Sequence, residues 1–319
     1  MRVHRWCSAA VLAGLALVVA ACGDDGPSRT DVLGDYANDV ALPRYQRLAA
    51  TADDLVAAVG EACAAPSDET VRAGLDAVGE ARSSWLSTAA MPTGPIMERR
   101  SEAVIDWPVR VADIERLISG SAPGVITADV IANNVGADTR GLSALDLVLS
   151  TDDVVDRLGD QRWCDYVTAT TEVVAAEAHL LLDDWTVSFA EGAPFVDVLA
   201  EDAGNTWVGM IVNDSINVVH MLTEAPDDAP DGAANVASDR ATQLDGLGEI
   251  VTAIGPLLGD ELAGRLAGEV DAAQAAFTDG DVDGGRALTG EVEATLATEV
   301  ASRLGVTIGF SDADGDSAG

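Results

Sequence analysis

Apolar residues recur at helical spacing along most of this chain. In residues 31–64, Val32 and Tyr36 are four positions apart, and Leu48 and Leu55 are seven apart. That spacing places them on one face of an amphipathic helix. A half-buried strand would instead alternate apolar and polar residues with a period of two, and no sustained alternation of this kind is found. The pattern therefore predicts a helical protein.

Breaks in this pattern set the expected order of elements. Pro43 lies inside the first segment, where we expect a kink or a break. Residues 91–108 contain three prolines and a glycine and are expected to be irregular. The other predicted helices cover 68–90, 109–119, short pieces of 127–158, 161–190, 204–224, 234–258, 260–278 and 283–304. The predicted fold is all-α, with two helical domains that resemble four-helix bundles and pack side by side. We place them at 31–194 and 195–310, followed by an acidic tail, 311–319.

The N-terminus has the layout of an export signal. Two arginines precede an apolar run, residues 11–20, that is too short to span a bilayer about 30 Å thick. The run ends in V-A-A-C at residues 19–22, which resembles a bacterial lipoprotein signal with cleavage before Cys22 and lipid attached to its sulfur. An ordinary signal peptide with an incidental cysteine is the alternative. We expect a signal at 1–21, a flexible tether at 22–30 and an exported protein held on a membrane by acyl chains.

The charge of the chain limits its partners. The formal net charge is −36, and every basic residue is an arginine. Such an acidic protein repels phosphate backbones, which argues against nucleic-acid binding. It could hold divalent cations weakly, but a solvated acidic surface is the simpler interpretation.

The four cysteines divide into two groups. Cys7 and Cys22 belong to the predicted signal, and Cys63 and Cys164 remain as a pair in an oxidising compartment. We predict that these two form a disulfide, which would close a loop of about 100 residues and stabilise the fold by about 4–5 kcal/mol. Two buried free thiols are the alternative.

Familiar catalytic motifs are absent or incomplete. His179 and His220 are not followed by a second histidine at metal-binding spacing, so we expect two isolated histidines on helices. Residues 141–145 read G-L-S-A-L, which lacks the second glycine of a serine-hydrolase elbow. Residues 279–290 open like a calcium loop, but Gly290 stands where the bidentate glutamate is required, which predicts an interhelical turn with acidic caps.

Several short motifs occur in a consistent order along the chain. They are A-L-P-R-Y at 41–45, C-A-A-P-S at 63–67, A-R-S-S-W at 81–85, G-P at 94–95, I-D-W-P at 105–108, R-W-C-D-Y at 162–166 and L-G-V-T-I-G-F at 304–310. Taken together, they resemble the imelysin-like family of bacterial envelope lipoproteins, sometimes classed as M75 peptidases. The resemblance covers about residues 31–319 and is weakest across 190–280.

The resemblance also gives the stretch around residue 141 a context. Many imelysin-like proteins carry G-x-H-x-x-E near this point, at the junction of two helical bundles. Here the glycine is Gly141, the histidine position holds Ser143 and the glutamate position holds Asp146. A serine hydroxyl is a poor ligand for zinc or iron and is not a base at neutral pH. We therefore predict no catalytic residue, and Asp146 as the one candidate metal ligand.

What remains is a predicted polar pocket between the bundles. The resemblance brings to it residues of the first bundle and a Ser-Asp-Arg segment of the second that is similar to a family S-x-R motif. The predicted binding residues are Arg82, Trp85, Asp106, Gly141, Ser143, Asp146, Ser238 and Arg240. A carboxylate with one or two arginines in a cleft suits a small polar or chelated ligand. The alternative is a capping box, in which Ser143 caps a helix and Asp146 is its third residue.

These observations predict a lipid-anchored, ligand-binding and non-catalytic envelope protein. The association of the resembled family with iron acquisition makes a metal or a metal chelate the expected ligand, with iron or another divalent cation as the candidate cofactor. An M75-type peptidase and a helical scaffold lipoprotein are the alternatives.

Overall fold

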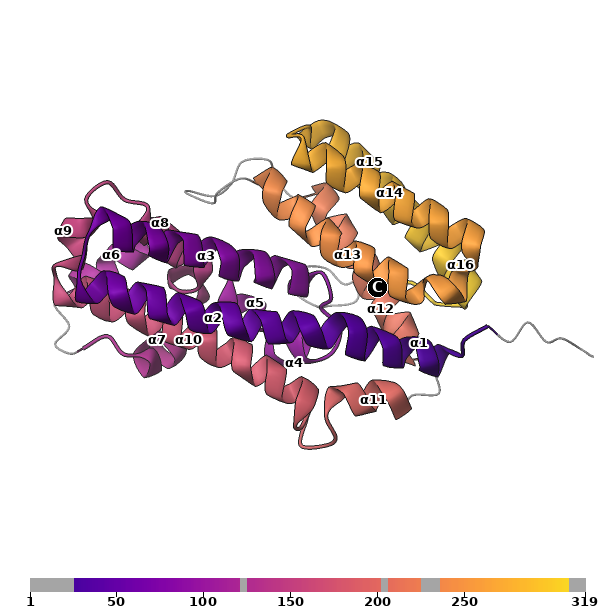
Figure 1. The fold of residues 1–319 in the computed structure, drawn as a ribbon, viewed down its shortest axis with the longest axis horizontal. Helices are drawn as coiled ribbons and strands as arrows, with labels where there is room; N and C mark the ends of the chain where they lie inside the picture. The colour runs from indigo at the N-terminus through magenta and orange to yellow at the C-terminus, as the bar shows by residue number, and fades with distance from the viewer. Residues whose placement is uncertain (1–25, 121–124, 202–205, 225–235, 310–319) are drawn as a thin grey trace, which may run out of the picture.

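A computed structural model describes residues 26–120, 125–201, 206–224 and 236–309. The predicted signal 1–21, its Cys22 and the acidic tail 311–319 lie outside these residues. Within them the chain is helical, and its one β-type contact is an isolated bridge between Asp106 and Gly141. The all-α fold class is therefore confirmed, and Figure 1 shows two groups of helices lying side by side.

The first group, from indigo to magenta in Figure 1, is built on three long helices. α2 packs against both α3 and α10, and the short helices pack around them. Its elements are α1 (Arg29–Asp35), η1 (Tyr36–Ala41), α2 (Leu42–Ala64), α3 (Asp68–Ala89), α4 (Pro95–Arg99), α5 (Glu102–Ile105), α6 (Val111–Ser119), α7 (Ala128–Asn134), η2 (Ala137–Thr139), α8 (Leu142–Leu149), α9 (Val154–Leu158) and α10 (Gln161–Thr186). We call this group the first bundle.

The second group, from orange to yellow, we call the second bundle. In it α14 packs against α13 and α15, and α12 packs against α15. Its elements are α12 (Thr206–Glu224), α13 (Val236–Leu258), α14 (Asp260–Thr278), α15 (Val282–Thr295), η3 (Leu296–Val300) and α16 (Ala301–Leu304). α11 (Phe195–Glu201) lies between the groups in sequence and packs on α1 and α10. The predicted domain boundary between residues 194 and 195 stays a prediction.

Pro43 does not break the first helix. The chain passes from α1 through a π-helical turn, η1, directly into α2, where Pro43 is in the first turn. The Leu42 N–H donates to Ala37 O, five residues earlier, so the helical hydrogen-bonding pattern widens directly before Pro43. The helical path continues past Pro43 and the expected break is absent, whereas the kink stays a prediction.

The disulfide between Cys63 and Cys164 is confirmed. It joins the C-terminal end of α2 to the N-terminal end of α10, with the two Cα atoms 5.5 Å apart. The predicted acidic turn between α14 and α15 is also present, because the Asp281 carboxylate accepts a hydrogen bond from the Gly284 N–H at the start of α15. Both features tie the ends of long helices together.

The two bundles meet where α13 packs against α3. Gly246 of α13 allows close approach, since a Cβ atom there would lie 2.5 Å from the Ser87 carbonyl oxygen. α1 also contacts α13, and η1 does the same. The predicted polar residues of the first bundle therefore have a neighbouring second-bundle helix to interact with.

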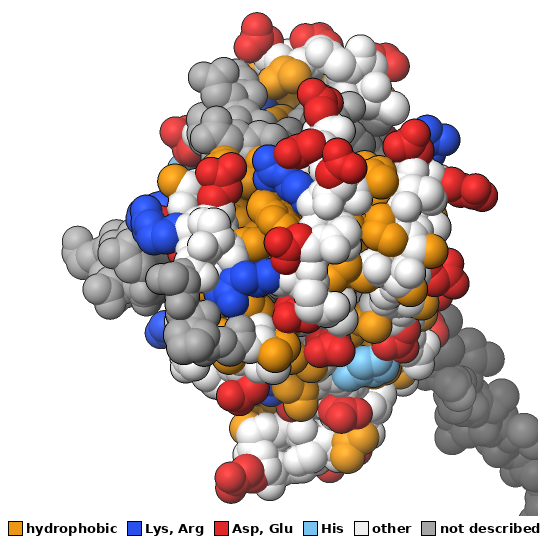
Figure 2. All heavy atoms as spheres, turned by 90° about the vertical axis from the view of Figure 1, so that its left-hand side faces the viewer, with side chains coloured by type: hydrophobic (Ala, Val, Ile, Leu, Met, Phe, Trp, Pro, Cys, Tyr) orange, Lys and Arg blue, Asp and Glu red, His pale blue; other side chains and the backbone are white. Residues whose placement is uncertain are grey.

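Acidic side chains are scattered over the face of the molecule drawn in Figure 2. Figure 2 shows them spread over one end of the molecule, among fewer basic side chains. In the part of the chain that the structure describes, no helix is both long and apolar enough to cross a membrane.

Candidate functional site

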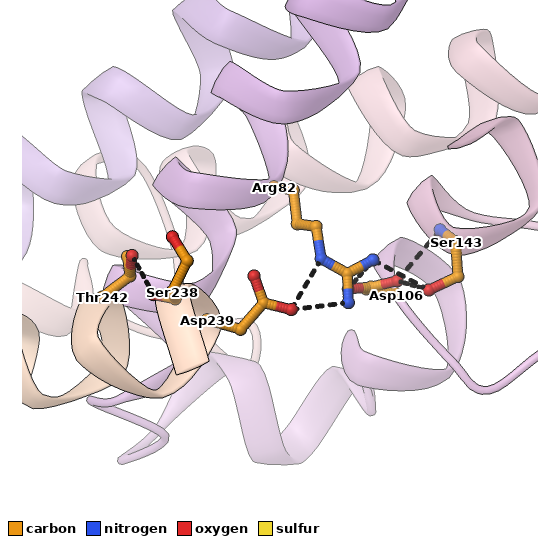
Figure 3. Close-up of polar contacts among 6 residues, drawn as sticks. All are labelled: Arg82, Asp106, Ser143, Ser238, Asp239 and Thr242. Carbon is orange, nitrogen blue, oxygen red and sulfur yellow. Dashed lines mark hydrogen bonds and ion pairs between the residues drawn. The ribbon is translucent and has the colours of Figure 1, made fainter. Parts of the chain in front are cut away.

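Arg82 of α3 lies at the contact between the bundles and binds groups from both of them. Its Nη1 donates to Ser143 Oγ at 3.0 Å and lies 3.4 Å from Asp106 Oδ2. On the other side, its Nε and Nη2 donate to Asp239 Oδ2 of α13 at 3.2 and 3.1 Å. Figure 3 shows the guanidinium between these partners, and only 15% of the Arg82 side chain is exposed. The charged contact thus bridges α3 and α13.

Asp106 and Ser143 form the first-bundle side of this contact. Asp106 Oδ1 accepts hydrogen bonds from the backbone N–H of Ser143 at 3.0 Å and from its hydroxyl at 2.5 Å. Gly141 permits the approach of the two segments, because its φ is +92° and an added Cβ would lie 2.7 Å from the Ile105 carbonyl oxygen. The glycine of the predicted motif is therefore needed by the backbone, and the serine is held by a carboxylate from another segment.

The predicted capping box at this helix is wrong. α8 begins at Leu142, and its N-cap residue is Gly141, which has no side chain that could accept a hydrogen bond. The free N–H of Ser143 at the start of the helix is instead satisfied by Asp106, which is 37 residues earlier in the chain. A carboxylate is favourable at a helix N-terminus, so a distant residue does what the local pattern assigned to Ser143 and Asp146.

Asp146 lies near these charged side chains but is not bonded directly to any of them. It is half-buried, and its carboxylate makes no hydrogen bond or ion pair within the described residues, although it acts on Arg82 through space. We call Arg82, Asp106, Ser143, Asp146 and Asp239 the Arg82 cluster. It contains three carboxylates and one guanidinium.

This excess of negative charge shifts the proton affinities of the cluster. Burial raises the pKa of Asp239 to about 6; Arg82 opposes the shift, and Asp106 and Asp146 add to it. Burial, with a contribution from Asp106, also raises the pKa of Asp146 against the pull of Arg82. For Arg82 burial works the other way, but the carboxylates outweigh it and raise its pKa. The guanidinium is therefore permanently charged, and the carboxylates are more numerous than it can neutralise.

Of the remaining predicted residues, Ser238 lies beside this cluster, and Trp85 and Arg240 lie away from it. Ser238 is exposed at the start of α13, next to Asp239 (Figure 3). Trp85 is buried in the hydrophobic core, and Arg240 is buried with its guanidinium 5.5 Å from the ring centre of Phe277. The sequence analysis missed Asp239. Its signal was present, because it is the middle residue of the Ser-Asp-Arg segment whose two outer residues were chosen.

Neither histidine reaches the cluster. His179 Nε2 lies 2.9 Å from Asp53 Oδ1, and His220 Nδ1 lies 3.0 Å from Glu293 Oε1. Both imidazoles are on exposed helix surfaces. They are thus paired with carboxylates elsewhere in the molecule and supply no base to Ser143.

Two adjoining clefts open beside the cluster. One, of about 450 Å³, lies between η1, α2, α3 and α13, and the other, of about 440 Å³, lies between α3, α13 and α14. They share Ser83, Thr242 and Asp245, and Ser83 is the immediate neighbour of Arg82. The cluster residues themselves do not line these clefts, which are connected to the cluster only through the chain neighbours Ser83 and Ser238. A larger cleft of about 600 Å³ lies at the disulfide, and no chain neighbour of the cluster lines it.

The cluster does not fit a bare metal ion. No group of three or more histidine, cysteine, aspartate or glutamate side chains is arranged to hold one within the described residues. The Arg82 guanidinium takes the position between the carboxylates, and Asp106 Oδ1 is already bonded to Ser143. Asp146, the predicted metal ligand, belongs to no such group among the described residues. We therefore derive no metal chemistry from this site.

Comparisons with known proteins agree on the family and the fold. Residues 41–279 match the sequence profile of the Imelysin family, peptidase M75. A solved imelysin-like protein from Psychrobacter arcticum 273-4 superimposes with a TM-score of 0.68 at 18% identity, over 88% of this chain and 97% of that one. An iron-regulated protein A precursor from Parabacteroides distasonis ATCC 8503 gives a TM-score of 0.67 at 16% identity, also over 88% and 97%. A search of curated proteins finds no match. The profile spans most of the chain, including the residues from α3 and α13 that form the Arg82 cluster, and the chain therefore belongs to the imelysin family.

Proposed function

We propose that this imelysin-family chain is a non-catalytic binding protein for a small polar ligand, and that the ligand is a metal chelate. The observation that carries the proposal is the Arg82 cluster, which is built from both bundles and whose chain neighbours Ser83 and Ser238 line two polar clefts. Ligand sites are concave and often lie at domain junctions, with a few convergent polar groups that fix the ligand. The cluster and its clefts have these properties.

The chemistry of Ser143 supports binding over bond cleavage. Its hydroxyl donates to Asp106 and accepts from Arg82, so both of its nearest polar neighbours hold it in place. An activated serine needs an adjacent general base of suitable pKa, most often an imidazole. The imidazoles of His179 and His220 are paired with carboxylates elsewhere. A serine held in this way positions Arg82 and Asp106.

A chelate suits the site better than a free ion because it brings its own metal ligands. The clefts then have to provide only hydrogen bonds and charge, which their serine, threonine, arginine and carboxylate side chains can do. The solved relative from Parabacteroides distasonis is described as iron-regulated, and iron is therefore the metal to test first. That relative is also described as a precursor. Together with the V-A-A-C segment, this supports an exported, lipid-anchored protein.

Equilibrium dialysis with metal analysis tests the proposal. The purified protein is dialysed against ferrous ion, ferric citrate, ferrioxamine B and hexaamminecobalt(III) at physiological salt. We expect saturable binding of one equivalent of at least one chelate, and at least tenfold weaker binding by Asp239→Asn. Asp54→Asn removes the same charge from an exposed position on α2 and should bind as the unaltered protein does. Binding of none of the chelates would overturn the proposal.

A peptidase assay tests the non-catalytic part separately. The protein is incubated with unfolded casein, and the products are followed by mass spectrometry. We expect no cleavage. Cleavage that is lost in Ser143→Ala would show that the serine acts as a nucleophile and would overturn this part of the proposal.

A further inference from the structure

The two clefts beside the Arg82 cluster form one groove along α13. Ser238, Thr242, Asp245 and Glu249 follow one another at helical spacing on a single face of α13, and all four line one or both clefts. At 1.5 Å per residue, this face is about 16 Å long. We call it the α13 groove. One end of it borders the Arg82 cluster, and the other reaches Asp39 in η1.

The accessible charge in the α13 groove is negative. Arg44 donates to Glu249 Oε2 at 2.9 Å and to Asp245 Oδ2 at 3.1 Å. Of these three side chains, that of the arginine is the most buried. Its side chain is 13% exposed, whereas those of Asp245 and Glu249 are 54% and 48% exposed. Arg82 is similarly enclosed by its carboxylates. A ligand in the groove therefore meets carboxylate oxygens, while these two guanidinium groups are already neutralised behind them.

A count of the charged side chains in and around the groove also gives a net negative charge. The carboxylates that line the groove or surround Arg82 are Asp39, Asp106, Asp146, Asp239, Asp245 and Glu249, and the arginines are Arg44, Arg47 and Arg82. Of these arginines, only Arg47 is well exposed, and it pairs with Glu80 at 3.8 Å. Three of these carboxylates, Asp39, Asp245 and Glu249, line the groove together with two guanidinium groups, and the other three surround Arg82 beside it. A cleft lined by one sign of charge concentrates ligands of the opposite sign.

A second observation points to a ligand independently of charge. Ser84 lines the groove and is only 3% exposed, yet its hydroxyl has no hydrogen-bond partner within the described residues. Leaving a buried hydroxyl without a partner is costly, and such groups are rare. The neighbouring Ser87 hydroxyl shows the usual solution, because it donates to the Ser84 carbonyl oxygen at 3.0 Å. Ser84 Oγ therefore has an unused hydrogen-bonding capacity beside the groove.

We infer that the α13 groove selects a cationic ligand rich in N–H donors, such as an amine-bearing metal chelate. Its positive charge pairs with Asp245 and Glu249, and one N–H group donates to Ser84 Oγ. This inference rests on the proposed function and adds the charge and the hydrogen-bonding character of the ligand. Anionic chelates are excluded from the groove by the same carboxylates.

The experiment compares two chelates of opposite charge by isothermal titration calorimetry at physiological salt. Hexaamminecobalt(III) is cationic and presents only N–H donors, and ferric citrate is anionic and presents mainly acceptors. We expect hexaamminecobalt(III) to bind at least tenfold more tightly than ferric citrate. Ser84→Ala should weaken its binding by about fivefold or more, and Asp245→Asn by about tenfold.

Two controls separate the groove from the acidic surface in general. Asp54→Asn removes an exposed charge from α2, and Ser215→Ala removes a buried hydroxyl that is bonded within α12, away from the groove. Both variants should bind hexaamminecobalt(III) as the unaltered protein does. If Asp54→Asn weakens binding as much as Asp245→Asn does, or if Ser84→Ala has no effect, the cation is held non-specifically and the inference is overturned.

The result also distinguishes this inference from the proposed function. Tighter binding of ferric citrate than of hexaamminecobalt(III) would overturn the inference and leave chelate binding intact. Failure of hexaamminecobalt(III), ferric citrate and ferrioxamine B to bind would overturn the two together.

Discussion

Two partly buried arginines of this chain meet their carboxylates in different ways. Arg99 of α4 binds Glu177 of α10 through both carboxylate oxygens, at 2.9 and 3.2 Å, and Ser101 Oγ donates to the same carboxylate at 2.7 Å. Asp184 approaches at 3.5 Å, and all four residues belong to the first bundle. Arg82 instead joins two bundles and is surrounded by three carboxylates, of which Asp146 makes no hydrogen bond within the described residues.

The two contacts differ in how many oxygens of each carboxylate accept hydrogen bonds. Both oxygens of Glu177 accept hydrogen bonds from the first bundle, so this contact stabilises one bundle and offers little to a ligand. Asp239 contacts Arg82 through one oxygen only, and burial raises its pKa to about 6. At the contact between the two bundles, carboxylates that still have unused hydrogen-bonding capacity can bind a ligand. The comparison therefore separates a structural arginine from one placed at a site.

The largest expected effect comes from removing Arg82. Arg82→Gln leaves three half-buried carboxylates without their cation and should lower the free energy of unfolding by about 3–5 kcal/mol at pH 7. Arg99→Gln leaves two and keeps the Ser101 donor, so its loss should be smaller. Urea denaturation followed by circular dichroism measures both. Arg47→Gln, at an arginine that is 65% exposed, should change stability by less than about 1 kcal/mol. A greater loss in Arg99→Gln than in Arg82→Gln would reverse the comparison.

Gly141 tests whether the backbone sets the position of Asp106 and Ser143. Gly141→Ala should destabilise the protein by about 2–3 kcal/mol, because φ is +92° and the new Cβ would press on the Ile105 carbonyl oxygen. Thermal unfolding measures the effect. Gly60→Ala is the matched control, since a Cβ in the middle of α2 meets no atom within 4 Å and should stabilise by up to about 1 kcal/mol. If both substitutions were neutral, the close contact at Gly141 would have no role in forming the cluster.

The helices of this chain were more predictable than its site. Long helices such as α3 and α14 follow from apolar spacing and from local caps, which are short-range properties of the sequence. At Pro43 the chain stays helical after the wider turn of η1, which no local pattern of the sequence predicted. The disulfide could be predicted because the predicted export signal accounts for Cys7 and Cys22 and leaves only Cys63 and Cys164 to pair.

The site depended on contacts across long stretches of chain. Family resemblance selected Arg82, Asp106 and Ser143, and the structure brings them within hydrogen-bond or ion-pair distance. It could not select Asp239 over Arg240, because the choice depends on how α13 is rotated against α3. One residue along a helix turns the side chain by about 100°, which carries Arg240 to Phe277 and Asp239 to Arg82.

Asp239 should make stability depend on pH in a defined direction. Burial raises its pKa from 3.8 to about 6 in the folded protein, so the folded state holds this proton more tightly than the unfolded state does. Its contribution is fully present below about pH 4 and is lost as the pH rises to about 6. That shift corresponds to about 3 kcal/mol, which screening at a side chain 23% exposed reduces to about 2 kcal/mol.

The difference between the unaltered protein and Asp239→Asn isolates this contribution. Urea unfolding of both at pH 4.5 and pH 7 should show the unaltered protein losing about 2 kcal/mol more than the variant over this interval. Equal pH dependence of the two proteins would mean that Arg82 neutralises Asp239 as fully as Arg99 neutralises Glu177.

Ser84 gives the smallest effect and sharpens the comparison most, because its expected sign is unusual. Replacing a buried residue normally destabilises a protein, but the Ser84 hydroxyl has no partner within the described residues. Ser84→Ala removes that unsatisfied group at little cost in packing and should raise the free energy of unfolding by about 1 kcal/mol. Ser87→Ala breaks the hydrogen bond to the Ser84 carbonyl and should lower it by a similar amount. Thermal unfolding at pH 7 measures both. A gain in stability in the same Ser84→Ala protein that binds hexaamminecobalt(III) less tightly would show that the hydroxyl is kept for a ligand, whereas a loss of stability would mean that it already has a partner in the folded chain.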